Sequence, residues 1–205
     1  MAGKNSGGQQ RWPGLALVAM MALGLAGCGT LGLSRSQSDS AAMTNQRVDQ
    51  SFRGKTLVSR LKPVQMNLPN GWEAAPTGSL HGNADLEAYN PNETMFLVVL
   101  GEDRDAVAQG NLQDQANIYL QILKGGLDSI VANQSLTSVD RVGSFPAVQY
   151  EVRGDLSQRT VAYLHTTIEM GDNFYQVVVW TPDDLRIANN EAMRAIVQEF
   201  RNAQQ

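Results

Sequence analysis

Few residues of this chain are of types that could do chemistry. The sequence contains two histidines, His81 and His165, and a single cysteine, Cys28. It has no Gly-x-Ser-x-Gly nucleophile motif, no His-Glu-x-x-His motif, no Gly-rich phosphate loop and no zinc-ligand spacing. We therefore expect no enzymatic activity, no catalytic residues and no bound cofactor or metal.

The two histidines sit in different sequence environments. His165 alternates in phase with Tyr163 and Glu169 along an expected strand, so the three side chains should share one face of a sheet. The simplest interpretation is a sheet position hydrogen-bonded to a neighbour. The alternative is a ligand or metal contact in a pocket on that face. His81 lies in the expected loop 77–85, where a solvated histidine is the default.

Two acidic clusters and three large aromatic residues complete the candidates. The cluster 102–105 could offer oxygens to calcium, but it lacks the spacing of a calcium loop, and a solvated charged loop is the better interpretation. Asp183-Asp184 suits the start of a helix better than acid and base catalysis. Trp72, Trp180 and Tyr150 are expected in the core rather than on a binding platform.

The first 27 residues have the layout of a secretory signal. Lys4 and Arg11 precede an apolar run, 15–26, which at ~1.5 Å per residue covers only ~18 Å of a ~30 Å hydrocarbon layer. The run ends in Leu25-Ala26-Gly27-Cys28, which resembles a bacterial lipobox. The resemblance implies a diacylglyceryl group on the Cys28 thiol, cleavage before Cys28, and further acylation with chains such as palmitate. The alternative is a buried free cysteine in an apolar helix.

The charge distribution separates a tether from a domain. Residues 28–62 carry six Lys or Arg and two Asp, a net charge of +4, in a stretch rich in Ser, Gln and Asn. Residues 63–205 carry eight Lys or Arg and eighteen Asp or Glu, a net charge of −10. We expect a flexible basic tether that either lies on anionic headgroups or is simply solvated. The acidic domain disfavours nucleic acid as a partner.

The domain reads as an α+β fold. Strands are expected at 64–68, 86–89 and 95–100, then a helix at 112–132 begun by Asn111 and Asp114, with its continuity at Gly125-Gly126 left open. Strands at 135–142, 147–153, 160–170 and 174–181 follow, and their short loops require an antiparallel meander. A final helix should bury Met193, Ile196, Val197 and Phe200. We expect the helices to pack on the faces of the sheet.

Four stretches then resemble the PsbP family and related exported bacterial proteins: residues 68–73, 145–151, 173–180 and 196–201. The likeness covers about residues 63–202. It implies an αβα sandwich, and members of this fold mostly act by binding other proteins. The chain departs from the photosystem-bound members in its long basic tether, and no stretch matches their subunit-contacting arms.

Together these observations predict a membrane-anchored, extracytoplasmic lipoprotein, on a periplasmic or lumenal face or at the cell surface. Residues 1–27 are its signal peptide, Cys28 is its lipidation site, and 63–205 form a monomeric domain that binds a protein partner or assists complex assembly. The alternative is a lipoprotein that binds a small ligand or metal in a sheet-face pocket near His165. An enzyme comes third.

Overall fold

The computed structural model describes residues 50–53, 55–107 and 110–204. Cys28, the predicted signal peptide and most of the predicted tether lie outside these residues. Within the described part, no helix is both long and apolar enough to cross a bilayer.

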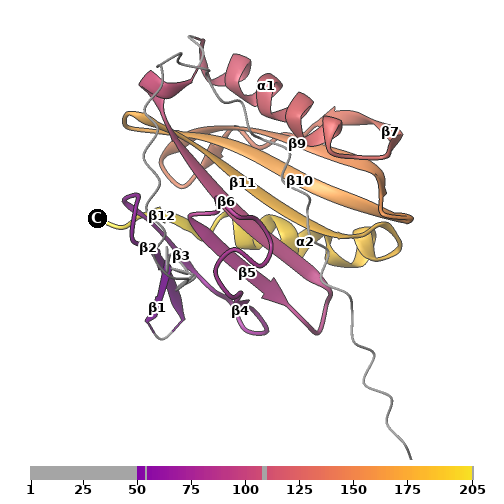
Figure 1. Cartoon of the computed structure of the whole chain (residues 1–205), viewed down its shortest axis with the longest axis horizontal. Helices are drawn as coiled ribbons and strands as arrows, with labels where there is room; N and C mark the ends of the chain where they lie inside the picture. The colour runs from indigo at the N-terminus through magenta and orange to yellow at the C-terminus, as the bar shows by residue number, and fades with distance from the viewer. Residues whose placement is uncertain (1–49, 54, 108–109, 205) are drawn as a thin grey trace, which may run out of the picture.

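The larger sheet is antiparallel, with the strand order β4-β5-β6-β11-β10-β9-β7, and β8 pairs with β9 (Figure 1). Its strands are β4 (Glu73–Ala74), β5 (Leu86–Asn90), β6 (Met95–Asp103), β7 (Ser129–Leu136), β8 (Arg141–Val142), β9 (Phe145–Leu156), β10 (Arg159–Met170) and β11 (Asn173–Pro182).

The centre of this sheet is a meander of three long strands, β9, β10 and β11. Two-residue turns join them, Ser157-Gln158 and Gly171-Asp172. Ser157 and Gln158 have φ angles of 50° and 67°, the left-handed backbone whose twist matches that of a tight antiparallel hairpin. The predicted antiparallel meander is therefore confirmed for its last three strands, whereas the strand expected at 135–142 is divided between the end of β7 and β8.

Helix α1 (Leu112–Gly125) covers one face of the sheet, which we call the α1 face. Ala116 and Leu120 of the helix pack there with Val152, Tyr163 and Trp180 of the sheet. Asn111 begins the helix as predicted, because its side chain accepts from the Asp114 N–H at 3.0 Å and Asp114 accepts in return from the Asn111 N–H.

The opposite face is covered by α2 (Arg186–Val197) and by a small second sheet, so the helices lie on both faces as predicted (Figure 1). Met193, Ile196 and Val197 of α2 join the larger of the two hydrophobic clusters, which also includes Leu164 and Ile168 of β10. The second sheet contains β1 (Gln50–Arg53), β2 (Thr56–Ser59), β3 (Val64–Asn67) and β12 (Phe200–Asn202).

The prediction of a helix over 112–132 is wrong in its second half. The helix ends at Gly125, and β7 begins at Ser129. Leu127 and Ile130 fit the helical period, but the chain turns back after the glycines to pair with β9. This return is close: a Cβ at Gly154 would lie 2.5 Å from the Ser129 carbonyl oxygen and 2.7 Å from Leu127 Cδ1. Only glycine fits there.

Both ends of the domain also differ from the prediction. Strand β2 pairs with β3 and buries Leu57 completely, so the folded part starts before the expected boundary at Pro63. Phe200 is fully buried, as expected, but it lies in β12 opposite Met66 rather than in the final helix. Strand β2 is only four residues long, too short for a clear period of its own. Strand β12 pairs with β3, which lies far away in the sequence, so periodicity alone cannot reveal that pairing.

Candidate functional site

His165 is sealed in the interior. Strand alternation places it on the α1 face, 1% exposed, with Nε2 2.8 Å from the Gln176 side-chain oxygen. Thr167 Oγ1 donates to the same oxygen at 2.7 Å. Burial lowers the pKa of His165 to about 4, so the ring is neutral at ordinary pH. The prediction of a hydrogen-bonded sheet position is confirmed.

Helix α1 closes the space above this ring. The Tyr119 ring centroid lies 6.5 Å from that of His165, and burial together with a hydrogen bond to Glu102 raises the pKa of the Tyr119 hydroxyl. His165 Nδ1 and Gln176 Nε2 are buried and have no hydrogen-bond partner among the described residues. Residues 55–107 and 110–204 also contain no group of three or more His, Cys, Asp or Glu placed to hold a metal. An open pocket near His165 is therefore not what the structure shows.

An open pocket does exist on this face, farther along the sheet. It has a volume of about 540 Å³ and lies where β6 and β10 begin and β11 ends. Its lining residues are Thr94, Phe96, Arg159, Thr160, Val161, Trp180, Pro182, Asp183, Asp184 and Leu185. Val161 precedes His165 by four residues, or about 13 Å along a strand. A cleft of this size is typical of ligand sites.

The floor of the pocket is aromatic. The Phe96 and Trp180 rings stack with centroids 5.5 Å apart, and Tyr163 packs on Trp180 at 6.0 Å. Trp180 is only 3% exposed, too little for an open binding platform. Trp180, like Trp72 and Tyr150, belongs to the core, as predicted.

One wall of the pocket is charged and held by ion pairs. Arg153 donates through Nε and Nη2 to the two carboxylate oxygens of Asp183, each at 2.6 Å. These bonds lower the pKa of Asp183. Arg186 reaches Asp183 at 3.9 Å and Glu151 at 3.0 Å. Both Asp183 and Asp184 lie in the 3₁₀ turn η2 (Asp183–Leu185) that leads into α2, as predicted for a helix start, but neither caps it with a side-chain hydrogen bond.

The rim is fixed by a strained corner. Thr94 has a φ of 54°, a left-handed conformation that a β-branched residue rarely adopts. Thr181 Oγ1 donates to the Thr94 carbonyl at 3.1 Å, and Asn189 of α2 donates to the Glu93 carbonyl at 2.6 Å. Helix α2 therefore supports this corner from the other side of the sheet.

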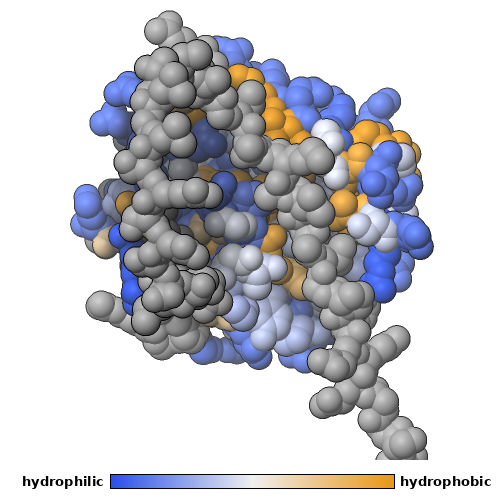
Figure 2. All heavy atoms as spheres, in the orientation of Figure 1, coloured by the Kyte–Doolittle hydropathy of each residue, from blue (hydrophilic) through white to orange (hydrophobic). Residues whose placement is uncertain are grey.

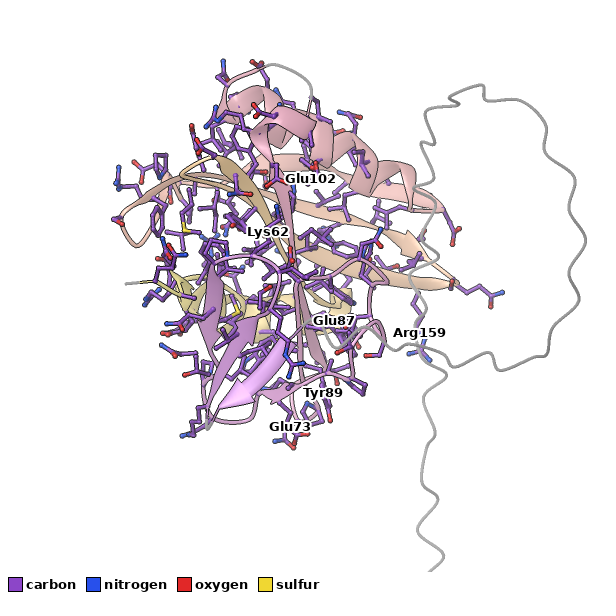
Figure 3. The ribbon with its side chains drawn as sticks, turned by 60° about the vertical axis from the view of Figure 1, so that its left-hand side comes forward. Lys62, Glu73, Glu87, Tyr89, Glu102 and Arg159 are labelled. Carbon is purple, nitrogen blue, oxygen red and sulfur yellow. The ribbon has the colours of Figure 1, made fainter. Side chains whose placement is uncertain are left out.

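Glu87 is a functional-looking residue that the sequence analysis missed. It is 1% exposed, and its carboxylate accepts from the backbone N–H groups of Gly78, Leu80 and His81. Figure 3 shows it in the middle of the domain. Its one signal in the sequence was an acidic residue inside an apolar strand. Burial lowers the pKa of His81, which is half-buried rather than fully solvated as expected.

The cluster 102–105 is not a freely solvated loop, because three of its four side chains have protein partners. Asp103 pairs with Lys62 at 2.5 Å, and Arg104 pairs with Glu169. The Arg104 guanidinium also lies 4.6 Å from the Phe174 ring centroid. Glu102 bonds Tyr119, as described above. These side chains fasten the end of β6, where the turn η1 (Arg104–Ala106) begins, to neighbouring strands.

Comparison with known proteins shows the fold. No protein-family model matches the chain, and neither does any curated protein. Among solved structures, cyanobacterial PsbP from Synechocystis sp. PCC 6803 matches with a TM-score of 0.50 and 12% identity, over 87% of this chain and 98% of that one. LpqN, involved in cell envelope biogenesis of Mycobacterium tuberculosis, has a TM-score of 0.47 and 15% identity over 67% and 81%. A Bacteroides thetaiotaomicron protein has a TM-score of 0.48 and 16% identity over 74% and 49%. At these identities the first match establishes architecture alone: the domain has the PsbP-like αβα fold.

Proposed function

We propose that this protein is an extracytoplasmic lipoprotein, anchored through Cys28, whose domain is a non-catalytic module that binds another protein. The anchor rests on the charged and apolar leader and on the lipobox-like tetrapeptide. Two acyl chains or more hold a protein on a membrane, whereas one chain gives reversible binding.

The domain supports a binding role through its surface. Aliphatic side chains are exposed on α1 and on the neighbouring edge strand: Ile118 at 41%, Ile122 at 37%, Val131 at 47% and Leu136 at 62%. Figure 2 shows hydrophobic residues gathered over these two elements. Strand β7 also contains no charged residue and no proline, the usual protections of a sheet edge against another strand. This exposed surface is the observation that carries the proposal.

The groups that could do chemistry support a non-catalytic role. His165 is sealed and neutral, Glu87 is occupied by backbone donors, and Asp183 is held by Arg153. In the described part of the chain, then, each of these candidate acid or base groups has a structural role.

The experiment is site-specific photo-crosslinking of the full-length protein in its native membrane. A benzoylphenylalanine at Ile122 or Val131 should give one discrete, stoichiometric adduct. The same group at Asp172, an exposed turn residue between β10 and β11, should give none and is the matched control. Absence of an adduct at both test positions, or equal adducts at all three, would refute the proposal.

A further inference from the structure

We propose that the pocket between β6, β10, β11 and η2 binds an apolar ring that carries a positive charge. Such a group occurs as a free arylalkylamine, which is protonated at neutral pH, or as an aromatic residue next to Lys or Arg in a protein segment. Where the source is a protein segment, the inference rests on the proposed function and deepens it.

The apolar lining of the pocket suits the ring of the ligand. Phe96 and Trp180 form the floor, and Val161 and Leu185 add aliphatic carbon to the walls. An aromatic ring can therefore stack or pack edge-on there, at the usual centroid separation of about 4.5 to 7 Å. The volume of about 540 Å³ is larger than a single ring needs, so the pocket also takes the group that the ring carries.

The charged lining residues suit a positive group on the ligand. Three charged residues line the pocket: Arg159, Asp183 and Asp184. Asp183 is held by Arg153, and Arg159 also has an interaction of its own. Figure 3 shows Arg159 at the periphery of the molecule. Asp184 is exposed and has no ion pair within the described residues. Its carboxylate is thus available to a ligand.

The electrostatic field of the whole domain also favours a positive ligand. Residues 63–205 carry a net charge of −10, which favours a cation and disfavours an anion at any mouth on this surface. The local carboxylate and the overall field therefore act in the same direction.

The rim of the pocket is held in place before any ligand binds. The corner at Thr94 is held in a left-handed conformation by Thr181, and Asn189 holds the adjacent Glu93 carbonyl. A rim fixed in advance lowers the ordering cost of binding.

The test uses the full chain labelled with 5-fluorotryptophan and observed by ¹⁹F NMR in detergent. The chain has three tryptophans, and Trp180→Phe identifies the signal of Trp180. Trp72, which packs in the cluster on the other face, serves as the internal control. The probes are phenethylamine and 3-phenylpropionate, which share a ring and differ in charge.

Phenethylamine should shift the Trp180 signal and leave Trp72 unmoved, with an affinity about tenfold above that of 3-phenylpropionate, because one charge is attracted where the other is repelled. Asp184→Asn should weaken the binding of phenethylamine about threefold or more and should strengthen the binding of 3-phenylpropionate. Asp172→Asn, which removes an exposed charge at the far end of β10, should change neither. Equal affinities for the two probes, or no shift of Trp180 at about 20 mM of either, would overturn the inference.

A second arm separates the two sources. Tighter binding of acetyl-Phe-Lys-amide than of phenethylamine supports a protein segment, and the reverse supports a free amine. Failure of the probes to bind leaves the crosslinks from Ile122 and Val131 unaffected, so the two proposals fail independently.

Discussion

At the scale of single residues, burial sets the protonation state of the histidine that sequence alone made a candidate for chemistry. His165 is neutral beneath α1, and its Nε2 is held by Gln176. Its pKa in the folded protein, about 4, lies below the ordinary histidine value of 6.5. Between these two values the unfolded chain binds a proton that the folded chain does not, so folding weakens as pH falls.

This predicts a loss of about 2 to 3 kcal/mol of stability between pH 7 and pH 4.5, at about 1.4 kcal/mol per pH unit below 6.5. Urea midpoints at the two pH values measure it. His165→Gln should flatten this pH dependence whatever its own stability, whereas His81→Asn should largely preserve it. The contribution of Asp183, whose pKa is lowered, is lost only at more acid pH. An unchanged slope in His165→Gln would contradict the burial argument.

At the scale of elements, the chain's last strand fastens α2 and the small sheet to the core. Phe200 in β12 is opposite Met66 of β3, and its ring lies 5.3 Å from that of Tyr175. Two residues earlier, Gln198 is exposed, and its side chain makes two long hydrogen bonds, of 3.3 Å to the Arg141 carbonyl and of 3.4 Å from the Gly143 N–H. The side chains of Phe200 and Gln198 should therefore differ greatly in their contributions to the free energy of unfolding.

Phe200→Ala should cost about 3 to 5 kcal/mol because it leaves a cavity in the core. Gln198→Ala should cost less than about 0.5 kcal/mol, as exposed substitutions usually do. Urea melts of the two variants provide the comparison. If their midpoints were equal, β12 would not be part of the cooperative unit.

At the scale of the whole molecule, the first strands close the second sheet before the expected start of the domain. Leu57 in β2 is fully buried and belongs to the same cluster as Met66, Met193 and Phe200. The predicted tether is therefore shorter than 28–62, since its last part is folded.

A chain that begins at Gln50 should consequently be more stable than one that begins at Pro63. Loss of Leu57 alone should cost about 2 to 5 kcal/mol, a large share of the roughly 5 to 15 kcal/mol that stabilises a domain. Thermal melts of both truncated chains, together with Leu57→Ala in the longer one, measure the difference. Equal melting temperatures would place β2 outside the folded unit.

The position of the molecule in the cell gives the last prediction. Cys28→Ser should abolish both processing and membrane attachment, because serine offers no thiol for lipidation. Fractionation after a high-salt wash, with immunoblotting for size, measures both effects. Thr30→Ser, just beyond the tetrapeptide, is the control and should be processed normally. A serine variant still in the membrane at mature size would refute the anchor.

Local pattern was sufficient for much of this protein. The meander, the start of α1 at Asn111 and the sheet face that His165 shares with Tyr163 follow from strand alternation, short turns and capping, each of which acts within a few residues. The sequence also indicates the leader and Cys28, which lie outside the described residues. Tertiary structure alone decided that residues 129–136 form a strand paired with β9 instead of continuing the helix, and that Leu57 and Phe200 share a second sheet. It also decided that the open pocket lies at Trp180 rather than at His165. These features depend on contacts between distant segments, and a period read along the chain carries no information about which segments meet.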